Sequence, residues 1–291
     1  MSPAWVEKSH FATRLKNGLG HSENSAQSDL MTEINLQNRW QRHNWQTSPF
    51  APDLKIIQAL VDGKTASGAG LSRFDALSRC LGETAEIMTL NQGESSEGLA
   101  AGPDFGFAAT QALSERLERW ALWEWWHGHL AAEPVIASEM IRKLRRGAVE
   151  NRETSLWLLT GFPHIQVAIA LSHASTGTQP ILGFGANICP RKAAQSALIE
   201  LGLMELNLME PSDGLNEYFS RMLQNTTRLF PALPPRPLKP APQSTGIEEN
   251  LVQRHVKFTL HDRSHPDSNL AVVKAEIQSA PSWTGISGPL L

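Results

Sequence analysis

ALSERLERWALWEWWHGH, residues 112–129, is the stretch that decides how this chain folds. Its apolar side chains recur at helical spacing, which predicts a helix over roughly 109–127. Glu115 and Glu118 are three residues apart, so they point from one face of that helix. The tryptophans that follow predict that the helix is anchored in the core, which would hold its acidic face rigid.

A second acidic pair lies upstream in CLGETAEIM, where Glu83 and Glu86 have the same spacing. Opposing pairs on two helices suit a hard divalent cation, since Mg²⁺ binds through carboxylates together with substrate phosphates. Glu-x-x-Glu is also common on solvated helices, where Glu115 and Arg119 would form an ordinary ion pair. A di-iron bundle expects Glu-x-x-His motifs, which neither pair forms.

The composition is that of a globular protein, with 291 residues, 41% hydrophobic and 19% charged. A net charge of −3 argues against a broad surface for nucleic acid or anionic membranes. Cys80 and Cys189 are isolated, and no cysteine-histidine cluster has zinc spacing. The N-terminus resembles no signal peptide, and no apolar run reaches the roughly 20 residues of a membrane span. We therefore expect a cytoplasmic protein.

The apolar pattern divides the chain into an N-terminal arm and one folded domain. We expect a polar arm over residues 1–50, with a short helix near 30–40, followed by a domain over 51–291. Within the domain, the spacing and the turn residues predict further elements. These are a helix over 72–90, a strand near 164–171, a helix from Pro190 to about 209, a proline-rich linker at about 231–242, and two late strands within 255–277.

Four segments, in this order, resemble the signatures of the YcaO family. The first is a glycine-rich turn followed by a Gly-Glu-x-x-Glu helix, and the second is a Glu-x-x-Glu-Arg helix followed by tryptophans. The third is a Gly-x-Pro strand followed by an Ala-Leu-x-Glu helix, and the fourth is a polar turn before a Val-Val-Lys strand. They read SGAGLSRFDALSRCLGETAE (67–86), ATQALSERLERWALWEWWHG (109–128), GFPHIQVAIAL (161–171) with GFGANICPRKAAQSALIEL (183–201), and LHDRSHPDSNLAVVKAEI (260–277).

The resemblance implies an α+β fold in which helices with acidic faces pack on mixed or antiparallel sheets. It implies ATP and Mg²⁺ as cofactors, with Arg119 on phosphate and with Lys274 and Ser67, the latter in the glycine-rich turn, as further ATP contacts. The chain has no Walker-type GxxxxGK[ST] loop, so metal ions would supply the compensating charge. No catalytic residue is identified. The implied Mg²⁺ ligands are Glu83, Glu86, Glu115, Glu118 and Glu200.

The activity that the resemblance implies is that of an ATP-dependent cyclodehydratase. Such an enzyme O-phosphorylates backbone amides of a ribosomally synthesised precursor peptide and leaves thiazoline or oxazoline rings. Thioamide or amidine formation is the alternative within the family. The implied partners are the precursor peptide, a leader-peptide-binding protein and a flavin-dependent azoline dehydrogenase, in a homodimer or a hetero-complex.

Three departures from the family pattern support a second hypothesis. Ile87 stands where arginine is usual, Leu203 stands where many members have glutamine, and the chain ends in SGPLL rather than in a proline-rich tail. These changes fit a minimised enzyme that requires a partner protein, or a degenerate, non-catalytic scaffold subunit of a peptide-modifying complex.

Overall fold

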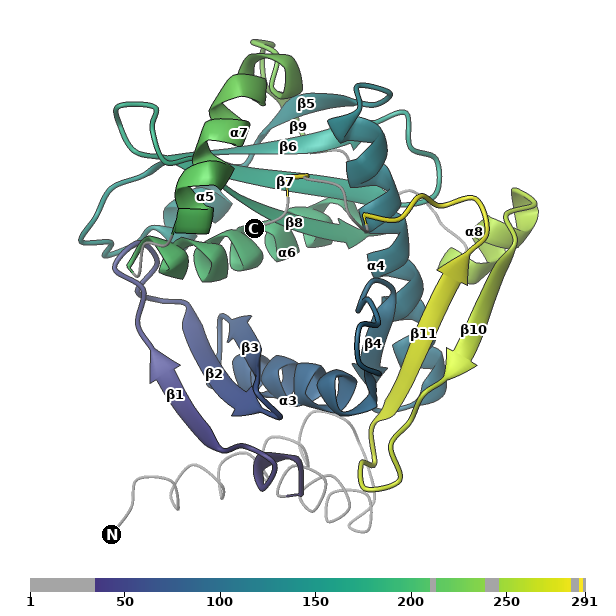
Figure 1. Ribbon diagram of the computed structural model, residues 1–291. Coiled ribbons are helices and arrows are strands. Elements are labelled where there is room, and N and C mark those ends of the chain that lie inside the picture. The colour runs from purple at the N-terminus through teal and green to yellow at the C-terminus, as the bar shows by residue number, and fades with distance from the viewer. Residues whose placement is uncertain (1–34, 210–212, 239–245, 284–287, 290–291) are drawn as a thin grey trace, which may run out of the picture.

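Three sheets and one long helix organise the computed structural model, which describes residues 35–209, 213–238, 246–283 and 288–289. The long helix, α4 (Phe105–Trp126), runs along one side of the molecule between an N-terminal sheet and a larger sheet (Figure 1). The third sheet lies on the outer side of α4. This mixture of helices and sheets confirms the predicted α+β class.

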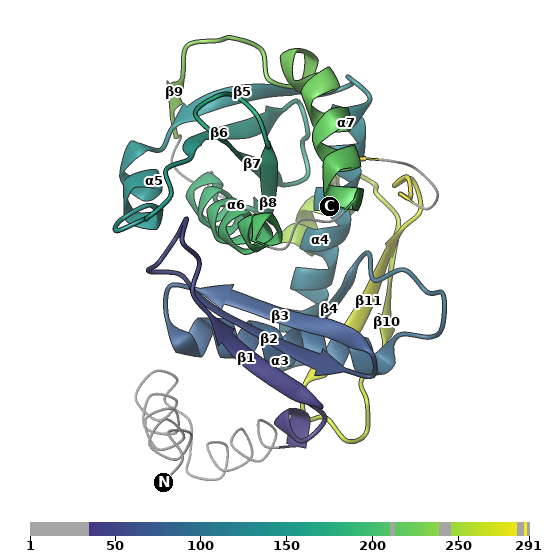
Figure 2. The same ribbon diagram turned by 60° about the vertical axis from the view of Figure 1, so that its left-hand side comes forward.

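The N-terminal sheet is antiparallel, with strand order β1-β2-β3, and one helix packs on it. β2 and β3 form a hairpin whose turn residues, Asp62 and Gly63, have φ values of 49° and 77°, as a two-residue hairpin turn requires. Figure 2 shows this sheet with its helix behind it. The elements are β1 (Arg42–Gln46), β2 (Lys55–Val61), β3 (Lys64–Gly70) and α3 (Arg73–Thr89).

The prediction that SGAG forms a glycine-rich turn was wrong, because these residues belong to β3. A Cβ atom on Gly68 would lie 1.9 Å from the carbonyl oxygen of Ala76, so the glycine lets α3 lie directly against the strand. Gly183 plays the same part on β8, where a Cβ would lie 2.2 Å from the backbone nitrogen of Leu201. Both glycines allow a helix to pack closely on a strand, a contact that the sequence pattern of a turn does not indicate.

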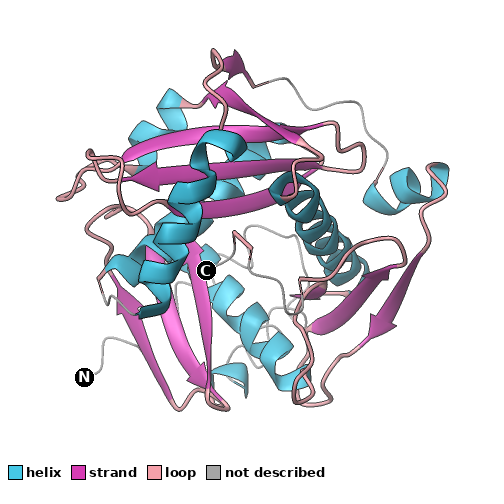
Figure 3. Ribbon diagram, turned by 45° about the horizontal axis from the view of Figure 1, so that its top comes forward, coloured by secondary structure: helices cyan, strands magenta, loops and turns pink. Residues whose placement is uncertain are grey.

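The larger sheet has the order β8-β7-β6-β5-β9 and is antiparallel except for β9, which pairs with β5 in parallel. In Figures 2 and 3, α6 and α7 lie on opposite faces of this sheet. Its strands are β5 (Ala131–Ile136), β6 (Glu153–Thr160), β7 (Gln166–His173), β8 (Ile181–Asn187) and β9 (Arg236–Pro237). The helices of this half are α5 (Ser138–Leu144), α6 (Pro190–Met204), the 3₁₀ helix η1 (Glu205–Leu208) and α7 (Asp213–Leu229).

The third sheet brings together strands that are far apart in sequence, in the order β10-β11-β4. α4 packs against both β4 and β11, so this sheet fixes the outer side of the central helix. The two late strands that the sequence predicts are confirmed as β10 and β11. The elements are β4 (Leu99–Gly102), α8 (Ile247–Gln253), β10 (Phe258–Asp262) and β11 (Ala271–Ile277).

Several predicted boundaries differ from the structure. β1 lies inside the predicted N-terminal arm, because its pairing with β2 supplies order that the weak apolar pattern does not show. α4 begins earlier than predicted, at Phe105, where the side chain of Asp104 caps the helix by accepting from the Phe107 amide. The third helix ends at Met204 and continues as η1.

Other predictions fall partly outside the described residues. Of the helix predicted near 30–40, only residues 35–37 are described as helical. The predicted proline-rich linker contains the short strand β9, and its residues 239–242 lie outside the described part. None of the helices in the described ranges is both long and apolar enough to cross a membrane.

The tryptophans of α4 anchor that helix in the main core, as predicted. Trp125 is 1% exposed and packs near Phe230, while Trp126 is 9% exposed. Trp120 and Trp123 are partly buried against the same core. The acidic residues of this helix are not directed to open solvent either, since Glu118 is buried and Glu115 is partly buried.

Candidate active site

Glu83 and Glu86 of α3 are each held by one backbone amide. The Ser67 amide donates to Oε2 of Glu83 at 2.7 Å, and the Ala101 amide donates to Oε1 of Glu86 at 2.8 Å. β3 and β4 therefore orient the two carboxylates from either side of α3. These hydrogen bonds engage only one oxygen of each carboxylate, which leaves the other for a ligand.

Glu115 and Glu118 of α4 flank a single guanidinium, that of Arg119. Its Nε lies 3.9 Å from Oε1 of Glu115, and its Nη1 lies 3.7 Å from Oε1 of Glu118. Both distances are too long for hydrogen bonds. The Nη1 atom is buried and has no hydrogen-bond partner, so Arg119 retains an unused donor inside the site.

Glu200 joins the group from α6, since its carboxyl interacts electrostatically with Glu118, Arg119 and Glu115. Glu115 likewise raises the pKa of Glu86, which links α4 to α3. Three helices that are far apart in sequence thus carry five interacting carboxylates, and those of Glu115, Glu118 and Glu200 act directly on Arg119. We call these five glutamates, together with Arg119, the carboxylate cluster: Glu83, Glu86, Glu115, Glu118 and Glu200.

Burial is the main cause of the unusual acidity of the carboxylate cluster. It raises the pKa of Glu115 to about 7, although Arg119 opposes the shift. Burial and the charge of Glu118 raise the pKa of Glu200 to about 8. Burial also raises the pKa values of Glu83, Glu86 and Glu118. One guanidinium cannot compensate five desolvated carboxylates, so the cluster favours protons or metal cations.

Lys274 and Ser67 lie at opposite margins of the carboxylate cluster. The Nζ atom of Lys274, on β11, donates to the backbone oxygen of Ser95. Burial lowers the pKa of Lys274, and the charges of Glu94 and Glu115 partly restore it. Ser67 contributes its backbone amide to Glu83, while its hydroxyl accepts a long hydrogen bond of 3.5 Å from Gln58.

The donor set fits Mg²⁺ and a phosphate-bearing ligand. Carboxylate oxygens are ligands that Mg²⁺ prefers, and this ion usually binds through one or two of them plus waters and phosphates. The unpartnered Nη1 of Arg119 suits a phosphate oxygen. Within the described ranges, no three histidine, cysteine, aspartate or glutamate side chains form a ready-made metal cage.

The sequence did not single out Glu97 and Arg116, which border the cluster. Glu97 acts electrostatically on both Glu115 and Arg119. Arg116 is 8% exposed, and its Nη1 lies 3.6 Å from Oε2 of Glu97. In the sequence, Arg116 lies between Leu113 and Leu117 on a helix whose apolar face is buried. This position is the signal that could have identified Arg116.

Two of the residues that depart from the family pattern, Ile87 and Leu203, lie in the described ranges and have apolar surroundings. Ile87 packs against the buried residues of the N-terminal sheet and α3, including Ala76. Leu203 packs against the main core from α6. Neither side chain adds a polar group to the carboxylate cluster.

The comparison with family models identifies the chain. Residues 91–275 match the model of the YcaO cyclodehydratases, which is described as ATP- and Mg²⁺-binding. This match covers more than half of the chain, so the protein belongs to the YcaO family. No curated protein matches the chain.

Solved structures share the fold at low identity. A heterocyclase in complex with substrate and cofactor has a TM-score of 0.71 and 16% identity, over 87% of this chain and 52% of that one. YcaO from Methanopyrus kandleri bound with AMPPCP and Mg²⁺ has a TM-score of 0.70 and 15% identity, over 93% and 95%. The E. coli microcin synthetase McbBCD complex with pro-MccB17 has a TM-score of 0.58 and 10% identity, over 80% and 86%. The chain therefore spans about half the length of the first of these proteins.

Proposed function

We propose that this protein uses ATP and Mg²⁺ to activate backbone amides of a ribosomally synthesised precursor peptide, as a cyclodehydratase of the YcaO type. The observation that carries the proposal is the carboxylate cluster itself. Five buried or partly buried glutamates come from three helices, and three of them act on one arginine whose Nη1 has no hydrogen-bond partner. Such a site lacks positive charge and has a donor ready for an anion, which is what a metal-nucleotide complex would complete.

In this proposal each residue of the cluster has a part. Glu83, Glu86, Glu115, Glu118 and Glu200 would hold Mg²⁺, and Mg²⁺ would neutralise charge on the phosphates when bound. Arg119 would donate to a phosphate oxygen through its unused nitrogen. Lys274, which already interacts with Glu115, would contact ATP at the outer margin. Ser67 would do so at the β3 side.

The chemistry requires an amide oxygen to become a leaving group. A Cys, Ser or Thr side chain of the peptide attacks the preceding amide carbon, and the oxygen receives the phosphoryl group of ATP. The oxygen then departs as phosphate, the nucleophile and the amide nitrogen lose their protons, and an azoline ring remains. The protein contributes position and electrostatics: the buried Arg119 stabilises the transferring charge, and burial excludes water that would compete as acceptor.

The product class and the partners extend this proposal. Thiazoline or oxazoline rings are the proposed products, and a sulfide or amine nucleophile at the same site would instead give a thioamide or an amidine. A leader-peptide-binding protein would deliver the precursor, and a flavin-dependent dehydrogenase would act on the azolines. We further propose a cytoplasmic homodimer or hetero-complex.

One observation favours a second candidate function, a non-catalytic scaffold subunit. Ile87 and Leu203 place apolar side chains where the family pattern has arginine or glutamine, and both pack into apolar clusters. A scaffold would keep the fold while losing nucleotide binding.

Calorimetric titration separates the two functions. ATP is titrated into the intact protein with and without Mg²⁺, then into a Glu115→Gln, Glu118→Gln variant. A Glu217→Gln variant is the matched control, because that carboxylate is 78% exposed on α7. Mg²⁺-dependent binding that is lost only in the double variant supports the enzyme. Absence of binding to the intact protein, both alone and with its partner proteins, overturns the catalytic proposal.

A further inference from the structure

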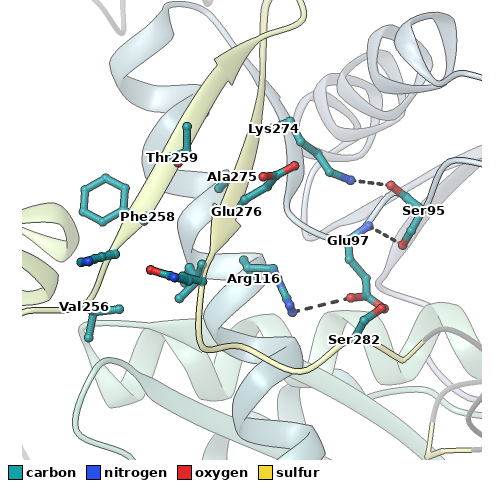
Figure 4. A pocket seen from close by; sticks show the side chains of 13 residues that line it. Ser95, Glu97, Arg116, Val256, Phe258, Thr259, Lys274, Ala275, Glu276 and Ser282 are labelled. Atoms are coloured by element: carbon teal, nitrogen blue, oxygen red, sulfur yellow. Dashed lines mark hydrogen bonds and ion pairs between the residues drawn. The ribbon is translucent and has the colours of Figure 1, made fainter.

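A cavity of about 850 Å³ lies beside the carboxylate cluster, over one end of the β10–β11 hairpin (Figure 4). Its size is in the range of ligand pockets. The walls come from five separate segments of the chain. They are residues 95 and 97, Arg116, 256–259, 274–278 and Ser282.

Arg116 supplies a buried donor with no acceptor to this cavity. The residue is 8% exposed, and its Nη2 donates to the backbone oxygens of Ala280 and Pro281 at 2.8 and 2.7 Å. Its Nη1 has no hydrogen-bond partner, since Oε2 of Glu97 is 3.6 Å away. An unsatisfied guanidinium nitrogen is costly to bury, so a ligand oxygen at this point would remove the cost.

The remaining lining favours an acidic ligand that also has apolar or backbone parts. Apolar side chains of Val256 and Phe258 form one wall. Cationic groups outnumber anionic ones, and the volume is far larger than an inorganic anion needs. The cationic lining residues are Arg116, Lys257 and Lys274, and the anionic ones are Glu97 and Glu276.

The cavity is coupled to the carboxylate cluster through two of its lining residues. Lys274 and Glu97 both interact electrostatically with Glu115. A ligand in the cavity would therefore lie next to the site where the proposed phosphoryl transfer occurs.

We propose that the cavity binds an acidic segment of the peptide substrate, with an Asp or Glu carboxylate of that peptide accepting a hydrogen bond from Nη1 of Arg116. The inference rests on the proposed function, because it assigns a substrate subsite to the same reaction. It makes Arg116 a specificity-determining residue for peptides that carry an acidic residue.

The test uses the full-length protein and two pools of fluorescein-labelled eight-residue peptides. Each peptide of the acidic pool contains two Asp or Glu residues, and the neutral pool has Asn or Gln at those positions. Fluorescence anisotropy should show the acidic pool binding about tenfold more tightly, as expected for one charge-assisted hydrogen bond. Arg116→Gln should reduce this preference to less than about twofold. Arg254→Gln, which removes an exposed arginine outside the cavity, should leave it unchanged.

A second variant keeps the test valid if Arg116→Gln unfolds the protein. Thr259 is exposed on β10 and lines the cavity, so Thr259→Trp should block it and abolish binding of both pools. Equal binding of the two pools, no binding of either, or displacement of the peptides by ATP alone would overturn the inference. Calorimetry of Mg²⁺–ATP on the same proteins separates the outcomes: if nucleotide binds and peptides do not, only this inference fails. If nucleotide does not bind, the proposed function fails.

Discussion

Two buried acidic regions of this protein differ in how their charge is balanced. Glu205, at the start of η1, is fully buried and accepts hydrogen bonds from both Nη atoms of Arg145, at 2.6 and 2.7 Å. Arg152 lies 3.2 Å from the same carboxylate, and the Ser172 hydroxyl donates to it. In the carboxylate cluster, by contrast, Arg119 lies 3.9 Å from Glu115 and 3.7 Å from Glu118, and no other cation of the cluster balances the five glutamates.

We take this difference to separate a structural site from the proposed binding site. Around Glu205 the chain supplies all the donors that a buried carboxylate needs, so the group is complete without a ligand. In the carboxylate cluster the chain supplies an excess of acceptors and leaves a donor of Arg119 unused. Fold stability alone would not produce such an excess, since desolvated carboxylates without counter-charge are unfavourable. In the proposed function, bound Mg²⁺ would supply this balance.

The largest expected effect is on the free energy of unfolding and concerns the network around Glu205. Glu205→Gln removes the charge that Arg145 and Arg152 require and should lower the free energy of unfolding by about 3–5 kcal/mol, because a buried pair is broken. Denaturant unfolding measures this value. Mg²⁺–ATP affinity of the folded fraction should stay unchanged, and a loss of affinity would contradict the division into two regions.

The next effect sharpens the role of the unused donor. Arg119→Gln should weaken Mg²⁺–ATP binding by about 1.5–3 kcal/mol, which is the range of hydrogen bonds to charged groups. Calorimetry measures the affinity, and Arg254→Gln, an exposed arginine on another element, serves as the control. Unchanged affinity in Arg119→Gln would show that this guanidinium does not contact the nucleotide.

A smaller effect concerns pH in the absence of Mg²⁺. Burial raises the pKa of Glu200 to about 8, above its ordinary value of 4.5, so the folded protein retains a proton that the unfolded chain has lost between these values. The free energy of unfolding should therefore fall as the pH rises from about 4.5 to 8. The contribution of this residue should be about 1–2 kcal/mol, because the structure around an ionised carboxylate relaxes and admits water.

Denaturant unfolding at several pH values checks this slope against Glu200→Gln, which should make it shallower, while the other four raised carboxyls retain their part of it. Added Mg²⁺ should also flatten it, since a bound cation favours the ionised carboxylate. Identical slopes for the intact protein and for Glu200→Gln would contradict the assignment.

The smallest effect is expected at a solvated ion pair. Glu217→Gln removes a contact of 3.8 Å with Arg221 on α7, where the carboxylate is 78% exposed. The free energy of unfolding should change by less than about 0.5 kcal/mol. A change comparable with that of Glu205→Gln would mean that burial does not separate the two classes of glutamate.

Local sequence signals predicted much of the candidate site. The three-residue spacing placed Glu115 and Glu118 on one helical face, and their tryptophan neighbours indicated which face is buried. Ser72, Pro190 and the apolar periodicity located the starts of α3 and α6. These features depend on contacts within one or two helical turns, so the sequence contains them directly.

Other features depend on contacts between distant segments, and the sequence could not show them. The SGAG segment was interpreted as a turn, because its close approach to α3 is visible only when the strand and the helix are packed together. The partners of Glu205 lie 33 to 60 residues away in the chain, so nothing near it indicates a buried network. The cavity at Arg116 likewise combines segments from residues 95 to 282.

The sequence by itself determined the acidic helix faces, the α+β class and, through the resemblance, the family that the comparison confirmed. Only the tertiary structure showed that Glu83, Glu86, Glu115, Glu118 and Glu200 interact across three helices, and that Glu205 belongs to a separate network. The reason is physical: periodicity fixes the direction of a side chain relative to its own helix. Desolvation and charge balance arise only when separate helices and sheets close around that side chain.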